Sequence, residues 1–317
     1  MRISVWDRGL DDNYLKLITQ LGADAIDFGT DSSFPSVQEQ GYPDLDELLK
    51  IKKKIHSWGL EINRVTLPNI SEKFMIGQDD SEIELENTTK ALHVFAEVGC
   101  PLVRQRFAGD TFPQLMTRYQ SRHRGGYKSR GESRYLTKGK PQTPALQDLE
   151  LWWERFCLVY QALVPIAEDT GIKLAIHPSD VPNPDTPVGG IGFHRVIEIF
   201  PSRSMGYLYC CGTRAETGGS AIVIDKINNY GRKGEIFMVH LRNLRGSLAT
   251  VGRFEEVLLD DGDMKLIKIL RHLDKVRFDG CINADHIPTL EGDRGSLSHG
   301  LSYSIGYIKA LFAALAE

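Results

Sequence analysis

The stretch Ile-Phe-Met-Val-His-Leu-Arg-Asn-Leu-Arg-Gly, residues 236–246, decides how the fold of this chain is interpreted. Four apolar residues run directly into His240, Arg242 and Asn243, and the stretch ends on a glycine. A short continuous apolar run is typical of a strand that is buried on both faces of a parallel sheet. Polar residues at the carboxyl end of such a strand lie where α/β barrels build their sites. A lone histidine there more often belongs to a solvated turn, so function depends on whether other strands end in the same way.

Strand-like and helix-like patterns alternate along the whole chain. The expected strands cover residues 3–6, 25–28, 60–67, 101–107, 172–176, 205–209, 237–239 and 280–284. The expected helices cover residues 11–21, 45–58, 81–98, 146–170, 194–200, 222–230, 264–273 and 301–316. Eight strand-then-helix units predict an α/β fold, a single (β/α)8 TIM barrel over residues 1–317. An open doubly wound sheet is the alternative, but no Gly-x-Gly-x-x-Gly follows the first strand and no Walker-type loop occurs in the sequence.

The composition is ordinary for a globular protein, with 41% hydrophobic and 25% charged residues. The net charge of −4 gives no global basic field that would attract nucleic acid. No apolar run approaches the ~20 residues of a membrane span, and the first residues lack the apolar region of a signal peptide. Five cysteines are few and lack zinc-finger spacing. We therefore expect a protein of the reduced cytoplasm.

One segment departs from this charge balance. Residues 118–140 hold eight Lys and Arg residues against a single acid, Glu132. They lie in an expected loop or insertion at about 108–143, longer than most loops of compact domains. A solvated, mobile loop and a basic lid that attracts an acidic substrate are equally compatible with this pattern. RNA binding by the Arg/Gly/Tyr-containing stretch is a third interpretation.

The last four expected strands end in potential metal ligands. These residues are His177, Cys210 or Cys211, His240 and Asp285. The ends of successive strands are neighbours around one rim of a barrel, so two imidazoles, a thiolate and a carboxylate should converge there. That set suits Mn²⁺, Fe²⁺, Co²⁺ or Zn²⁺ better than Ca²⁺ or Mg²⁺, which prefer oxygen ligands. Only one of the two cysteines can face the barrel axis, because adjacent strand residues point to opposite faces.

Further polar residues follow the same strand ends. Asp180 could orient an imidazole or hold a substrate hydroxyl, and Arg242 could clamp a carboxylate bidentately. His286, next to Asp285, is a candidate general acid or base. His299 and Tyr303 precede the last helix and could supply a second proton donor, or simply cap that helix.

Several motifs together resemble the D-mannonate dehydratases of hexuronate degradation. They are Ala-Ile-His-Pro-Ser-Asp (175–180), Tyr-Cys-Cys-Gly (209–212), Val-His-Leu-Arg-Asn (239–243), Ala-Asp-His (284–286) and Ile-Gly-Tyr-Ile-Lys (305–309). The resemblance is strongest over residues 172–317. It is looser over residues 1–106, where Arg8 and Gly9 resemble an early Arg/Gly motif of that family.

This resemblance implies a xylose-isomerase-like barrel that binds Mn²⁺ or Fe²⁺ and dehydrates D-mannonate to 2-keto-3-deoxy-D-gluconate. It implies His286 as a catalytic residue, with Arg242, His299 and Tyr303 as further candidates. The family's metal ligands correspond to His177, Cys210, His240 and Asp285. The candidate substrate-binding residues are Arg8, Asp180, Arg242 and Asn243.

The sequence also departs from the family. The fourth strand ends in Arg-Gln-Arg-Phe (104–107) and lacks the family's asparagine, Ile287 replaces a glycine, and His299 stands where the family has a tyrosine. These changes concern the identity of the substrate more than the metal site. Two alternatives stay open: a sugar epimerase or isomerase of the xylose-isomerase type, and a non-catalytic sugar-acid-binding homologue. We expect a small anionic sugar acid as the ligand, no nucleic acid or membrane partner, and a homodimer as a possible assembly.

Overall fold

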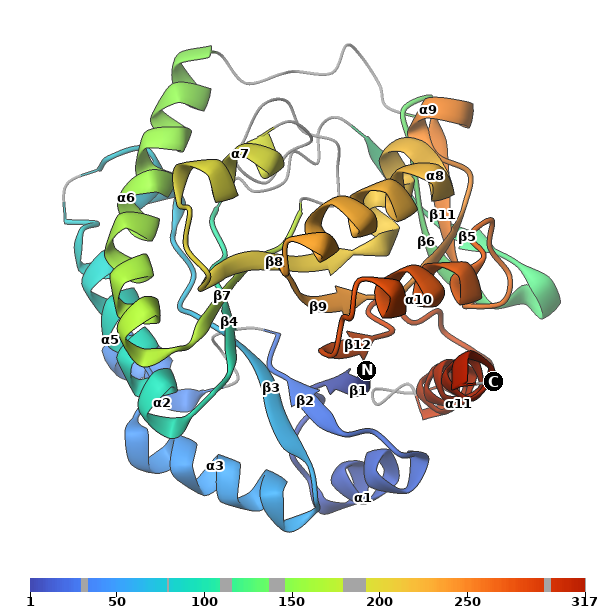
Figure 1. Cartoon of the computed structure of the whole chain (residues 1–317), viewed down its shortest axis with the longest axis horizontal. Coiled ribbons are helices and arrows are strands. Elements are labelled where there is room, and N and C mark those ends of the chain that lie inside the picture. Colours follow the sequence, from blue (N-terminus) through green and yellow to red (C-terminus); the bar gives the residue numbers. More distant parts are fainter. Residues whose placement is uncertain are drawn as a thin grey trace.

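Eight parallel strands close into a barrel in the order β1-β12-β9-β8-β7-β4-β3-β2 (Figure 1). The computed structural model describes residues 1–29, 34–78, 80–108, 116–136, 146–178, 192–293 and 298–316. The barrel strands are β1 (Arg2–Trp6), β2 (Ala25–Asp27), β3 (Glu61–Thr66), β4 (Leu102–Arg104), β7 (Lys173–Ile176), β8 (Met205–Cys210), β9 (Ile236–His240) and β12 (Cys281–Asn283). Each corresponds to one of the eight expected strands. The prediction of a TIM barrel is confirmed, and the open sheet is excluded.

Helices surround the barrel. They are α1 (Asp12–Leu21), α2 (Pro35–Gln40), α3 (Leu45–Ser57), α4 (Glu72–Met75), α5 (Ile83–Val98), α6 (Leu146–Thr170), α7 (Gly192–Ile199), α8 (Cys211–Arg232), α9 (Leu248–Val251), α10 (Leu266–Lys275) and α11 (Ser298–Ala316). The Asp11 side chain starts α1 by accepting a hydrogen bond from the Tyr14 backbone, and Gly22 ends it in the left-handed conformation. The expected helix at 222–230 is longer in the structure, because α8 begins directly after β8 and is interrupted at Gly219. Among the described residues, no helix combines the length and the apolar character needed to cross a membrane.

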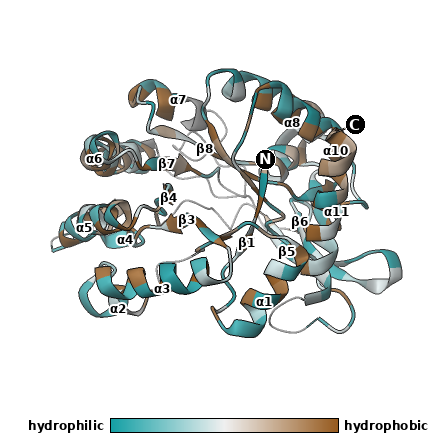
Figure 2. Ribbon diagram, turned by 60° about the horizontal axis from the view of Figure 1, so that its bottom comes forward, coloured by the Kyte–Doolittle hydropathy of each residue, from teal (hydrophilic) through white to brown (hydrophobic). Residues whose placement is uncertain are grey.

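The hydrophobic core lies between the strands and these helices. One cluster joins strand residues such as Val65 and Val239 to helix residues such as Leu92 and Leu270. Figure 2 shows hydrophobic residues on the barrel strands and on parts of the surrounding helices. A smaller cluster inside the barrel takes one residue from each of four neighbouring strands: Leu102, Ala175, Leu208 and Met238. Strands buried on both faces explain the continuous apolar runs of the sequence.

A second, antiparallel sheet has the strand order β10-β11-β6-β5. It consists of β5 (Thr117–Arg122), β6 (Lys128–Ser133), β10 (Asn243–Arg245) and β11 (Arg253–Val257), with a 3-10 turn at Arg124–Gly126 between β5 and β6. We call it the appended sheet. The expected loop at 108–143 is therefore wrong over 117–133, which forms a hairpin, while 109–115 and 137–145 lie outside the described residues. The hairpin is mostly polar, so it lacks the apolar alternation that announces a strand.

Candidate metal centre

Four side chains converge at the carboxyl-terminal mouth of the barrel. His177 Nε2 lies 3.2 Å from His240 Nδ1, which lies 3.3 Å from Asp285 Oδ1. Cys210 Sγ lies 3.9 Å from Asp285 Oδ2. The ligand atoms of His177, Cys210 and His240 all lie within 4.8 Å of one another, and all four residues are buried. The structure thus brings together the four residues that the strand ends had suggested as ligands.

The spacing of these atoms fits a transition-metal ion. Metal–ligand bonds of about 2.1 Å place neighbouring ligand atoms roughly 3.0 to 3.4 Å apart. The His177–His240 and His240–Asp285 distances lie in this range, and Cys210 Sγ lies somewhat farther out, at 3.9 Å from Asp285. The Nε2 atom of His240 is buried and has no hydrogen-bond partner among the described residues. A set of two imidazoles, one thiolate and one carboxylate suits Mn²⁺, Fe²⁺, Co²⁺ or Zn²⁺. The donor set and its spacing therefore fit the ion that the sequence motifs imply.

The two cysteines point in different directions. Cys210, at the end of β8, lies in the cluster, whereas Cys211 belongs to the hydrophobic core outside the barrel. Burial raises the pKa of Cys211 well above the usual value of a thiol. A thiol that stays protonated is a poor metal ligand. Cys210 is therefore the cysteine positioned to bind a metal.

The protonation states of the cluster also suit metal binding. Burial lowers the pKa of His240 and favours the neutral imidazole, which is the form that ligates. Burial alone would raise the pKa of Asp285, but His240 and His286 hold it well below the usual value of a carboxyl. Asp285 has a φ of 60°, which is uncommon for a residue other than glycine, and its backbone N–H donates to Asn283. Such backbone strain clusters at functional sites.

Arg242 is enclosed by carboxylates of the protein itself. Its Nη1 lies 2.7 Å from Glu216 and 3.0 Å from Glu256, and its Nε lies 3.2 Å from Asp285. Its Nη2 donates to the Thr213 hydroxyl at 3.1 Å. Only 1% of the residue is exposed. The guanidinium thus holds Asp285 and two glutamates, and the expected clamp on a substrate carboxylate, which would compete with these contacts, stays a prediction.

His286 forms a close pair with Glu256. Its Nδ1 lies 2.5 Å from Glu256 Oε1, and its Nε2 lies 3.8 Å from Asp285 Oδ2. Burial would lower the pKa of His286, but these two carboxylates outweigh it and raise the pKa to about 9. The Glu256 carboxylate also binds Arg242 and, at 2.8 Å, Arg130. Sequence reasoning missed Glu256 because it lies on β11 of the appended sheet, which was not predicted.

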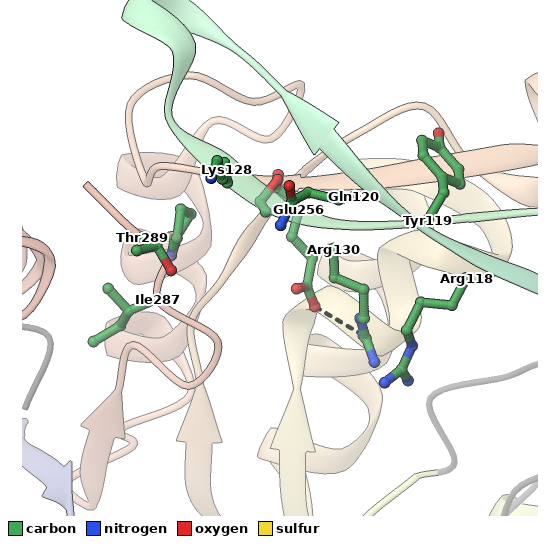
Figure 3. Close-up of a pocket in the computed structure, with 10 residues that line it drawn as sticks. Arg118, Tyr119, Gln120, Lys128, Arg130, Glu256, Ile287 and Thr289 are labelled. Atoms are coloured by element: carbon green, nitrogen blue, oxygen red, sulfur yellow. Dashed lines mark hydrogen bonds and ion pairs between the residues drawn. The ribbon is translucent and has the colours of Figure 1, made fainter. Parts of the chain in front are cut away.

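A pocket of about 450 Å³ opens between the appended sheet and the segment that follows Asp285 (Figure 3). Its lining includes Arg118, Gln120, Lys128, Arg130, Glu256 and Thr289. The register pairs Gln120 with Arg130, so alternation places the first four of these residues on one face of the hairpin. Glu256 connects this pocket to His286. The basic residues of the expected lid therefore form a wall beside the candidate site.

The side chain of Asn243 is hydrogen-bonded within the protein. Its side-chain amide donates to the carbonyls of Leu259 and Met264, at 2.8 and 3.2 Å, and its Oδ1 accepts from the Met264 backbone. Only 1% of the residue is exposed. Asn243 fixes the turn between β11 and α10, and its expected substrate-binding role stays a prediction.

His299 and Tyr303 make their described contacts near the start of α11. His299 Nδ1 lies 3.0 Å from the Glu291 carbonyl, and its backbone N–H donates to Asp293. Tyr303 is hydrogen-bonded to Asp260. None of these contacts, which are drawn from the described residues, reaches the metal cluster. They favour the alternative in which both residues stabilise this end of the helix.

The other two predicted substrate-binding residues have different outcomes. Arg8 follows β1 and lines a small cavity together with Asn283 and Ile287, close to the end of β12. A contact with a substrate at the barrel mouth stays a prediction for Arg8. Asp180 lies outside the described residues.

Two residues at the barrel mouth were not singled out from the sequence. The ring of Trp6, at the end of β1, lies 5.5 Å from the ring of His240. Arg64 of β3 lies over the Trp6 ring with its Cζ 4.7 Å from the centroid. Burial lowers the pKa of Arg64 to about 10. The sequence held one indication of Arg64: it is a charged residue inside the third expected strand. A fully buried arginine is rare, so such a residue often has a specific role.

Comparison with known proteins places the chain in a family. The family model described as D-mannonate dehydratase (UxuA) matches residues 143–317. Mannonate dehydratase 2 of Halalkalibacterium halodurans is 22% identical, over 81% of this chain and 82% of that protein. The crystal structure of mannonate dehydratase from Streptococcus suis serotype 2 has the same fold, with a TM-score of 0.80 and 20% identity over 99% of this chain and 95% of that one. A xylose isomerase domain protein from Alicyclobacillus acidocaldarius has a TM-score of 0.62 and 16% identity, with both chains fully covered. The chain belongs to the D-mannonate dehydratase family.

Proposed function

We propose that this protein is a metal-dependent hydro-lyase that converts D-mannonate to 2-keto-3-deoxy-D-gluconate and water. It would act in hexuronate catabolism in the cytoplasm. One observation carries the proposal: a His/Cys/His/Asp cluster with metal-ligand spacing lies beside a histidine–glutamate pair in a member of this family. The names of the relatives support D-mannonate as the substrate.

The cofactor would be Mn²⁺ or Fe²⁺, held by His177, Cys210, His240 and Asp285. When bound, such an ion supplies Lewis-acid stabilisation of the charge that develops next to the substrate carboxylate. Arg242 contributes from the protein side, since its contact with Asp285 fixes the orientation of that ligand.

Dehydration requires two proton transfers. A base removes the proton from C2, and the electron pair of the broken C–H bond becomes the C2–C3 double bond. The C3 hydroxyl leaves with a proton as water. The resulting enol then loses its C2 hydroxyl proton and takes up a proton at C3, which gives the 2-keto acid. The elements of one water molecule are lost overall.

We assign His286 to protonation of the leaving hydroxyl. The Glu256 carboxylate, in contact with Nδ1, raises the pKa of His286 and favours the protonated imidazole. Because Glu256 holds Nδ1, the nitrogen left to exchange a proton with a bound molecule is Nε2. His299 and Tyr303 stay predictions for the transfer at C2.

The test is to load the purified protein with Mn²⁺ and to supply D-mannonate together with several other aldonates. Formation of a 2-keto acid with loss of water would support the proposal. A product of unchanged mass would identify a sugar epimerase or isomerase. Tight binding of an aldonate without turnover would indicate a non-catalytic binding protein.

A further inference from the structure

Arg64 has two buried donors that nothing in the described protein satisfies. The residue is 0% exposed. Its Nη1 donates to the Thr66 hydroxyl at 3.0 Å. Its Nε and Nη2 have no hydrogen-bond partner among the described residues, although the charges of Asp27 and Asp285 favour its charged form. Buried guanidinium groups are normally paired, so these donors point to a ligand that is absent here.

The guanidinium of Arg64 lies at the carboxyl ends of β3 and β1, next to Thr66 and Trp6. The register between β2 and β3 pairs Ile26 with Ile62 and then Asp27 with Arg64, passing over Asn63. Such a bulge re-aims the side chain beside it and is frequent next to active sites.

The guanidinium also has a fixed plane close to the metal cluster. Its Cζ lies 4.7 Å from the centroid of the Trp6 ring, and that ring lies 5.5 Å from the ring of His240. The Trp6 ring therefore lies between Arg64 and His240, a candidate metal ligand. Stacking on the indole limits the orientations that the guanidinium can adopt.

We propose that Arg64 binds the carboxylate of the sugar acid through Nε and Nη2. These two groups form one edge of the guanidinium, whose parallel N–H bonds match the two oxygens of a carboxylate. Arg64 thus takes the role that the sequence had suggested for Arg242. Only the identity of the acid, D-mannonate, rests on the proposed function.

Titration calorimetry tests whether Arg64 binds the carboxylate. The measurements use Mn²⁺-loaded protein that carries His286→Asn, because this variant should bind the substrate without converting it. The ligands are D-mannonate and its neutral amide, D-mannonamide. Arg64→Lys and Arg64→Met should weaken D-mannonate binding by about 10- to 100-fold, since a charge-assisted bidentate contact is lost. Binding of D-mannonamide should change less than about 3-fold. Arg203→Met, an exposed residue at the opposite end of the barrel, is the control and should leave both affinities unchanged.

Two results would overturn the inference. An unchanged affinity for D-mannonate would mean that only water occupies these donors. An equal loss for both ligands would mean that Arg64 acts through the structure of the site. The Tm of the ligand-free Arg64→Met variant is measured alongside: a lowered Tm together with an equal loss for both ligands would assign Arg64 to the structure of the site.

The outcome is independent of the proposed reaction. If the wild-type protein converts no aldonate but its binding of carboxylates depends on Arg64, the dehydratase proposal fails and this inference stands. If the wild-type protein converts D-mannonate and the Arg64 variants bind it normally, the dehydratase proposal stands and the inference about Arg64 fails.

Discussion

Replacing Glu256 by glutamine tests whether the appended sheet takes part in catalysis. The Glu256 carboxylate lies 2.5 Å from His286 Nδ1, 2.8 Å from Arg130 and 3.0 Å from Arg242, and only 5% of the residue is exposed. Glutamine keeps the shape and one acceptor oxygen but removes the charge that holds the imidazolium. We expect kcat to fall about 10- to 100-fold, which corresponds to about 1.4 to 2.8 kcal/mol of barrier.

The assay is steady-state kinetics with D-mannonate at saturating Mn²⁺, together with the metal content of each variant. The KM and the metal content should stay close to wild type, because the contacts of Glu256 are to His286 and the two arginines. Glu255→Gln is a matched control: Glu255 is the neighbouring residue of β11, and it accepts from the Tyr119 hydroxyl at 2.7 Å. A wild-type kcat in Glu256→Gln, or an equal loss in Glu255→Gln, would refute the reasoning.

Three further predictions concern single residues of the site. Cys210→Ser should weaken Mn²⁺ binding by more than about 10-fold in a metal titration, whereas Cys211→Ala should not weaken it; the opposite order would reverse the assignment of the ligand. Because the pKa of His286 is raised to about 9 in the folded protein, its charged form stabilises the metal-free protein at neutral pH, and this contribution disappears as the pH rises through 9. Urea unfolding from pH 6 to 10 should show that fall in the wild type and a smaller one in His286→Asn, and identical pH profiles would contradict the pairing with Glu256. Asn243→Ala should lower the free energy of unfolding by about 2 kcal/mol and leave the KM for D-mannonate unchanged, whereas a raised KM at full stability would restore its substrate-binding role.

The barrel and its metal cluster could be predicted because both depend on local sequence patterns. Alternating apolar runs and amphipathic helices set the order of the strands. Once the strands form a closed parallel barrel, His177, Cys210, His240 and Asp285 must meet at one rim. Only the choice between Cys210 and Cys211 needed coordinates, because a shift of one residue turns a side chain to the other face.

The surroundings of the cluster depend on contacts that local patterns do not contain. Glu255 of β11 pairs with Gly131 of β6, about 120 residues earlier in the chain, and this pairing brings Glu256 to His286. The carboxylate partners of Arg242 could not be predicted, because its burial among them is a property of the packed site. Arg64 reaches the barrel mouth through a bulge, which a sequence pattern does not announce.

Anomalous diffraction from crystals grown with Mn²⁺, recorded on both sides of the manganese absorption edge, would show directly whether the barrel mouth binds the ion and through which residues. We expect one strong peak per chain at the carboxyl-terminal mouth of the barrel, bound by His177, Cys210, His240 and Asp285. No peak at this position, or a peak bound by other residues with Cys210 turned away, would contradict it.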